Sequence, residues 1–76
     1  RLVVQPLEFF WSHEPPFVRH PSPDVLDEFF DWLREQGVAK RSIPIPDRGT
    51  GQWILFIYQH VDRVALEAWV PSKKEG

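Results

Sequence analysis

The sequence predicts an α+β domain in which one amphipathic helix packs on a small antiparallel sheet. Residues 24–35 repeat apolar side chains with the period of a helix. Residues 52–60 form a run of β-branched and aromatic side chains typical of a strand. Short turns between the later segments favour antiparallel pairing of consecutive strands. We therefore expect a single domain of 76 residues with the element order β-α-β-β-β.

Bulky side chains make a core feasible in so short a chain. A domain of this size buries only about 60% of the surface that its unfolded chain exposes. The chain contains six Phe, four Trp and one Tyr, and an aromatic side chain buries roughly 150–250 Å². Hydrophobic residues at 42% and charged residues at 26% are typical of a globular domain.

Composition also excludes several classes of site. The chain has no cysteine, so it has no disulfide framework, thiolate nucleophile or cysteine-based zinc site. No apolar run approaches the roughly 20 residues of a membrane helix, and no leader is recognisable. We therefore expect a cytoplasmic protein without membrane contact. The first residue is Arg1, which is compatible with a piece of a longer protein.

The first two segments are predicted from their prolines. Residues 1–11 should form an edge strand interrupted by Pro6, because proline cannot donate to a strand ladder. Residues 12–21 are rich in proline and should form an ordered loop of partly polyproline II character, with Phe17 or Val18 turned inward.

The helix over residues 22–37 is the best-supported element. Ser22 is a favourable N-cap, Pro23 suits the first helical position, and Gly37 is typical of a helix end. Acidic side chains fill the face opposite the apolar stripe. The stripe consists of Val25, Leu26, Phe29, Phe30, Trp32 and Leu33.

A three-stranded meander is predicted over residues 38–70. Pro44 and Pro46 place the missing donors on one side of its first strand, which should therefore be an edge strand. The expected strands are 38–46, 52–60 and 64–70, and residues 71–76 are expected to be a frayed tail.

The predicted strand over residues 52–60 is apolar on both faces, whereas one helix can cover only one of them. We expect its uncovered face to bind a partner, because large exposed apolar patches usually mark interaction sites. The predicted partner-binding residues are Ile54, Phe56, Tyr58, Trp69 and Trp11. The chain would then be a non-enzymatic protein–protein interaction or self-association domain, with a homodimer as one form. In the opposing interpretation, the proline-rich loop covers this face through Trp11 and Phe17.

A nucleic-acid-binding module is the alternative hypothesis. Aromatic side chains on a sheet can stack on bases, and several cations could flank them. The net charge of −2 disfavours this alternative. The candidate flanking residues are Lys40, Arg41, Arg48, Arg63, Lys73 and Lys74.

No catalytic residue, cofactor or metal is predicted. His13 and His20 lie seven positions apart in a proline-rich segment, which is not a compact ligand spacing. The acidic helix face is expected to be solvated rather than catalytic.

Overall fold

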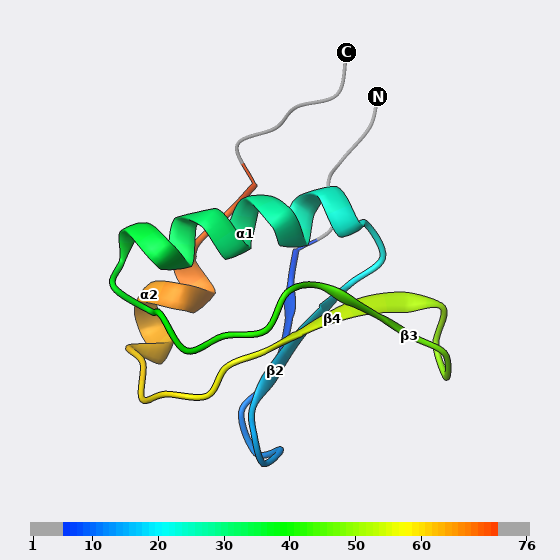
Figure 1. Cartoon of the computed structure of the whole chain (residues 1–76), viewed down its shortest axis with the longest axis horizontal. Coiled ribbons are helices and arrows are strands. Elements are labelled where there is room, and N and C mark those ends of the chain that lie inside the picture. Colours follow the sequence, from blue (N-terminus) through cyan, green and yellow to red (C-terminus); the bar gives the residue numbers. More distant parts are fainter. Residues whose placement is uncertain (1–5, 72–76) are drawn as a thin grey trace.

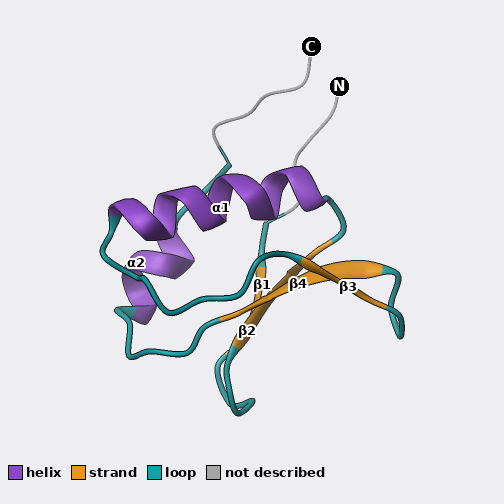
Figure 2. Ribbon diagram, viewed as in Figure 1, coloured by secondary structure: helices purple, strands orange, loops and turns teal. Residues whose placement is uncertain are grey.

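The computed structural model describes residues 6–71, which form a four-stranded antiparallel sheet and two helices (Figure 1, Figure 2). The predicted α+β class with an antiparallel sheet is confirmed. The predicted element order is wrong, because the strands and α1 follow the order β-β-α-β-β and a second helix comes after them. The elements are β1 (Glu8–Phe10), β2 (Phe17–His20), α1 (Pro23–Glu35), β3 (Ile45–Asp47), β4 (Gln52–Phe56) and α2 (Arg63–Ala68).

The strands lie in the order β1-β2-β4-β3. Val18 of β2 pairs with Phe9 of β1 and with Leu55 of β4, so β2 and β4 form the centre of the sheet. The first strand and the proline-containing strand β3 lie at the two edges, as the sequence predicts. The strand over residues 1–11 is shorter than predicted, and residues 1–5 lie outside the described residues.

The interpretation of residues 12–21 as a loop is wrong in its second half. Residues 17–20 form the central strand β2, bonded to β1 on one side and to β4 on the other. Pro16 and Pro21 flank this strand but do not interrupt it, so each of its residues can donate to a ladder. Of the two residues expected to turn inward, Val18 is fully buried, whereas Phe17 is half-buried.

The predicted strand over residues 64–70 is wrong, because residues 63–68 form helix α2. The carboxylate of Asp62 caps this helix by accepting a hydrogen bond from the backbone N–H of Ala65. Leu66 is buried, whereas Val64 and Val70 are 77% and 71% exposed. Val64, Leu66 and Val70, which would share one face of a strand, therefore do not form one buried face.

The other two strands of the predicted meander are shorter than expected. In the 38–46 segment only β3 is regular, with one isolated bridge between Arg41 and Ile57. The strand predicted over 52–60 ends at Phe56. The tail predicted at 71–76 lies outside the described residues except for Pro71.

Helix α1 lies where the sequence predicts it, and backbone hydrogen bonds define its ends. Ser22 occupies the N-cap position, but its side chain makes no cap hydrogen bond; its N–H donates to Nδ1 of His20 at 2.9 Å. At the other end, Gly37 has a φ of 84° and the N–H of Val38 donates to the carbonyl of Leu33 at 2.9 Å. This pair of features is the Schellman arrangement that ends many helices.

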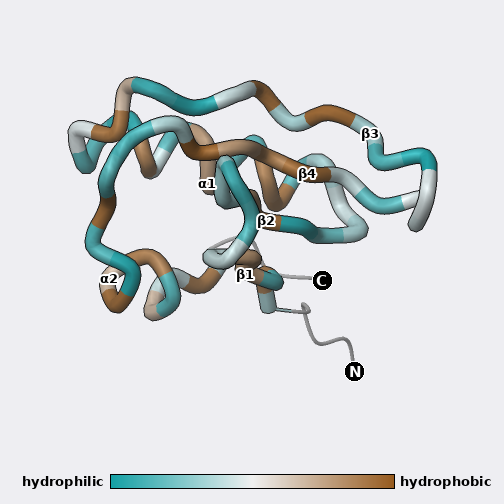
Figure 3. Tube along the Cα trace, turned by 90° about the horizontal axis from the view of Figure 1, so that it is seen from below, coloured by the Kyte–Doolittle hydropathy of each residue, from teal (hydrophilic) through white to brown (hydrophobic). Residues whose placement is uncertain are grey.

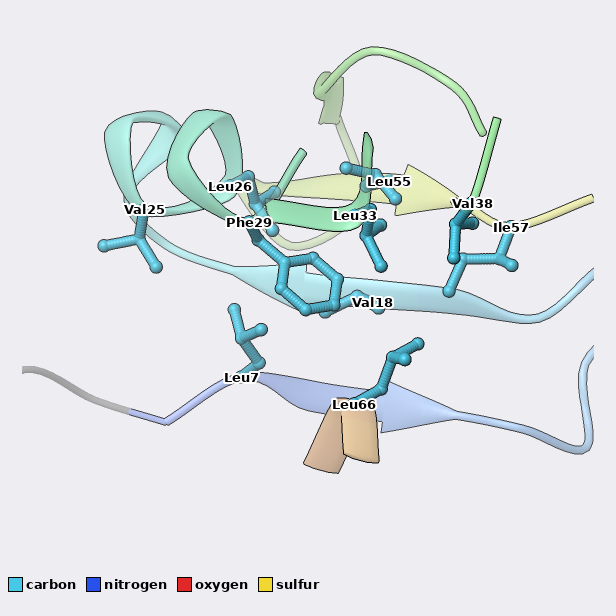
Figure 4. Packing of buried hydrophobic residues seen from close by; sticks show 10 residues of the cluster. All are labelled: Leu7, Val18, Val25, Leu26, Phe29, Leu33, Val38, Leu55, Ile57 and Leu66. Atoms are coloured by element: carbon cyan, nitrogen blue, oxygen red, sulfur yellow. The ribbon is translucent and has the colours of Figure 1, made fainter. Parts of the chain in front are cut away.

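The core lies between the helices and one face of the sheet. Figure 4 shows side chains of β2, α1, β4 and α2 gathered in one cluster with three from the flanking segments, Leu7, Val38 and Ile57. Phe29 and Leu33 of α1 are fully buried there, as are Val18 and Leu55 of the sheet. Leu66 is the buried contribution of α2.

Candidate functional site

The two faces of the sheet differ in burial. On the face toward the helices, Val18, His20 and Leu55 are buried. Their neighbours on the opposite face, such as Phe17 and Phe56, are only half-buried. Figure 3 views the molecule from the side opposite α1, where β4 and β2 lie in front of that helix. We call the face turned away from α1 the open face.

Four aromatic side chains form a continuous row across the open face. The ring centroids of Phe10 and Phe17 are 4.6 Å apart, and those of Phe17 and Phe56 are 5.7 Å apart. Tyr58 extends the row beyond Phe56 at 6.2 Å. His13 packs edge-on against Phe17 with centroids 5.0 Å apart. We call Phe10, Phe17, Phe56 and Tyr58 the aromatic row.

The register of the strands explains why these rings meet. Phe10 pairs with Phe17 across β1 and β2, and Phe17 pairs with Phe56 across β2 and β4. Side chains of directly paired residues lie on the same face and contact each other. Tyr58 follows Phe56 by two positions, and its N–H donates to the carbonyl of Lys40 at 2.8 Å. The sheet therefore holds the row in place.

Charges beside the first ring of the row are balanced. The Arg19 guanidinium lies over the ring of Phe10, 4.7 Å from its centroid, and Nε of Arg19 donates to Oε1 of Glu8 at 2.9 Å. Ile54 pairs with Ile45 on the same face and continues the apolar surface toward β3. This end of the open face is thus apolar, and the ion pair at its margin carries no net charge.

A hollow of about 400 Å³ lies beside the exposed end of the row. Tyr58, which is 54% exposed, forms one wall of this hollow. Glu14 is exposed at the same hollow and makes no ion pair within residues 6–71. The lining residues are Glu14, Pro15, Pro16, Ile57, Tyr58, Gln59 and His60.

The structure brings together only part of the predicted site. Ile54, Phe56 and Tyr58 share the open face, in agreement with their alternation along the sequence. Trp69 lies on the helical side, where its ring centroid is 5.0 Å from that of Phe29. Trp11 stacks on Phe9, which packs against the core. These two tryptophans do not belong to the open face.

Trp11 also connects β1 to α2. Its indole Nε1 donates a hydrogen bond to the carboxylate of Glu67, and Arg63 lies over its ring at 5.2 Å. These contacts hold α2 beside the end of β1. A structural role in joining two elements therefore accounts for Trp11.

The sequence interpretation missed Phe10 and Phe17 as members of the open face. Residues 17–20 alternate between half-buried and buried, with Phe17 and Arg19 on one side and Val18 and His20 on the other. The sequence itself does not show this alternation, because Phe17 and Val18 are both apolar and the two residues after them are both polar, and the surrounding prolines favoured a loop. Had residues 8–10 and 17–20 been predicted as a hairpin, Phe10 and Phe17 would have been expected on the same face.

Among the described cations of the nucleic-acid hypothesis, Lys40 is exposed opposite Tyr58 at the end of the aromatic row, whereas Arg41 and Arg63 lie on the helical side. The Arg41 guanidinium lies over Phe30 at 3.9 Å and donates to the carbonyls of Phe30 and Val38. Arg63 lies over Trp11 on the helical side. Lys73 and Lys74 lie outside the described residues.

His13 and His20 make local contacts in the described part of the chain. Nδ1 of His13 lies 2.7 Å from the carbonyl oxygen of Pro15, whereas His20 is buried beside the start of α1. Over residues 6–71, no group of three His, Asp or Glu side chains is placed to hold a metal ion. Neither helix of this part has the length and apolar content needed to cross a membrane.

No protein-family model, no curated protein and no solved structure matches this chain.

Proposed function

We propose that this domain is a non-enzymatic protein-interaction module whose contact surface is the aromatic row together with Ile54. The observation that carries the proposal is the unbroken contact of four aromatic rings on the face of the sheet turned away from α1. Both described helices pack on the other face, through Phe29 and Leu66.

The free-energy cost of leaving aromatic surface in water supports this assignment. Aromatic surface left in water forgoes about 25 cal/mol of stabilisation for each Å² that could be buried. A short domain has little stability to spare, so a row of rings kept at the surface favours a role in binding. Tyrosine is a favoured anchor in protein interfaces because it combines apolar area with a hydroxyl group. Tyr58 is the most exposed member of the row.

Charge supports a protein partner over a nucleic acid. Phosphate backbones need unpaired cations along their path. On the open face, Arg19 is already paired with Glu8, and Glu14 and Asp47 add negative charge near the two ends. Arg41 is held at Phe30 and Arg63 at Trp11. Lys40 lies opposite Tyr58 at one end of the row and Arg48 lies in the turn between β3 and β4, so the described basic flank of the row is sparse rather than continuous.

Site-specific photocrosslinking tests the proposal. A photoreactive phenylalanine analogue at position 58 should yield discrete protein adducts, or a crosslinked dimer, in an extract of cells that make the protein. The same analogue at position 64, on exposed Val64 of α2, is the matched control and should yield none of them. Adducts at position 58 that disappear on nuclease treatment would instead support nucleic-acid binding, and equal labelling at both positions would contradict a site on the open face.

A further inference from the structure

We propose that the aromatic row and the adjacent hollow bind a proline-rich segment of a partner in the polyproline II conformation, with a basic side chain of that segment at Glu14. This inference rests on the proposed function and specifies the chemistry of the partner. Such segments dock in aromatic-lined grooves because their helix is preformed and little conformational entropy is lost on binding.

The size of the open face favours a peptide over a second folded copy. Strands of three to five residues, at about 3.3 Å per residue and about 4.8 Å between strands, give the sheet an area of only a few hundred Å². A stable interface between folded proteins buries about 800 Å² per partner. An extended segment of several residues can cover the row and needs no more area than the open face provides.

The spacing of the rings is compatible with that of a polyproline II helix. Successive members of the row are 4.6, 5.7 and 6.2 Å apart. Alternate rings, such as Phe17 and Tyr58, are therefore up to about twice that step apart. In a polyproline II helix, residues three positions apart lie on the same side and are separated by roughly 9 Å. Two prolines with this spacing can each contact one ring of an alternate pair.

The edges of the sheet favour this mode over the addition of a strand. Pro46 of β3 and Pro44, which precedes that strand, carry no N–H to donate to an incoming strand. The opposite edge is β1, which is three residues long and is followed by Trp11, bonded to Glu67 of α2. A polyproline II segment needs no ladder of backbone hydrogen bonds and can bind to the face of the sheet instead.

Charge at the hollow selects a basic segment. Glu14 is exposed and has no ion pair within residues 6–71, whereas the carboxylate beside Phe10, that of Glu8, is paired with Arg19. Lys40 lies opposite Tyr58 but does not line the hollow. Because Glu14 and Tyr58 line the same hollow, a cation next to the last bound proline would meet a carboxylate. This asymmetry also fixes the direction in which the segment runs.

Fluorescence anisotropy with a defined probe tests the inference on the full chain. The probe is a fluorescein-labelled peptide of repeated Pro-Pro-Ala triplets ending in Arg-Arg. We expect saturable binding that weakens about tenfold in Tyr58→Ala, because loss of an anchor ring removes a large share of interface energy. Val64→Ala is the matched control and should bind like the parent chain, since Val64 lies on α2 and is 77% exposed.

Two further comparisons make the result specific. A peptide with every proline replaced by alanine should not bind, and a peptide ending in Glu-Glu should bind more weakly than the basic one. In Glu14→Gln this preference for Arg-Arg should shrink. Equal binding of the alanine peptide, or a preference for Arg-Arg that is unchanged in Glu14→Gln, would overturn the inference.

The experiment separates failure of the inference from failure of the proposed function. If photocrosslinking at position 58 gives protein adducts while the proline-rich peptide does not bind, the surface is correct and the partner chemistry is wrong. Saturable binding of oligo(dT), or a concentration-dependent dimer lost in Tyr58→Ala, would replace the proline-rich segment by a nucleic acid or by a second copy. Amide NMR spectra of each variant show whether it remains folded, so a loss of binding is assigned to the site only where they match the parent chain.

Discussion

Phe17 stands directly opposite Phe56 in the pairing of β2 with β4, and their rings meet edge to face with centroids 5.7 Å apart. These residues are separated by most of the described chain, and only the β2–β4 register brings them together. The contact joins the stacked pair Phe10 and Phe17 of the β1–β2 hairpin to Phe56 and Tyr58. The two pairs of rings therefore form one surface. Edge-to-face pairs of this kind contribute roughly 0.5–1.5 kcal/mol beyond the area that they bury.

Acidic substitutions of Tyr58 and Trp69 should differ sharply in their effect on stability. Tyr58→Glu should leave the midpoint of urea unfolding almost unchanged, because Tyr58 is 54% exposed at the end of the row. Trp69→Glu should lower the free energy of unfolding by about 2–4 kcal/mol, since it places a carboxylate against Phe29 and Trp32. Equal stability of the two variants would contradict the assignment of Trp69 to the helical side.

Truncation of Phe29 should be among the most damaging single changes. The side chain is fully buried and contacts Phe9, Trp32 and Trp69. Phe29→Ala should cost about 3–5 kcal/mol, which approaches the whole stability of a small domain. Circular dichroism during urea titration measures the loss, with Val64→Ala as the exposed control. A cost below 1 kcal/mol in Phe29→Ala would show that the core is not centred on this ring.

The cap at Asp62 should stabilise α2. Its carboxylate accepts a hydrogen bond from the N–H of Ala65 at the start of a helix of only six residues. Asp62→Ala should therefore lower the free energy of unfolding by about 1 kcal/mol, whereas Asp62→Asn should retain most of it. Hydrogen exchange at the amides of 65–68 should accelerate in the alanine variant. Identical exchange in the two variants would argue against a capping role.

The left-handed conformation of Gly37 should disfavour a β-carbon there. Its φ of 84° lies in a region where L residues are strained, although no atom lies within 4 Å of the position a β-carbon would take. Gly37→Ala should cost about 1 kcal/mol, and Gly37→Asn should cost less because asparagine tolerates this conformation. Thermal unfolding of both variants checks the ranking. Alanine as stable as glycine would contradict the observed helix end.

The sequence alone determined the elements whose signals are local. Helix α1 combines an apolar stripe, a proline at its first position and a glycine after its end, and these features favour a helix whatever surrounds it. The alternation of Ile54, Phe56 and Tyr58 likewise places them on one face of any strand through that segment. Prolines at Pro44 and Pro46 restrict their segment to an edge in any antiparallel sheet.

Tertiary structure alone decided the state of the two short segments at 17–20 and 63–68. A four-residue segment can become a strand only when partners receive its hydrogen bonds, and β2 has one on each side. A six-residue helix is not stable by itself, so α2 depends on Leu66 in the core, on the contact of Glu67 with Trp11, and on its cap at Asp62. In the folded chain Trp11 and Trp69 lie on the helical side, whereas Phe10 and Phe17 lie on the open face. Membership of a surface depends on pairing between distant segments, and that pairing has no signature within either segment.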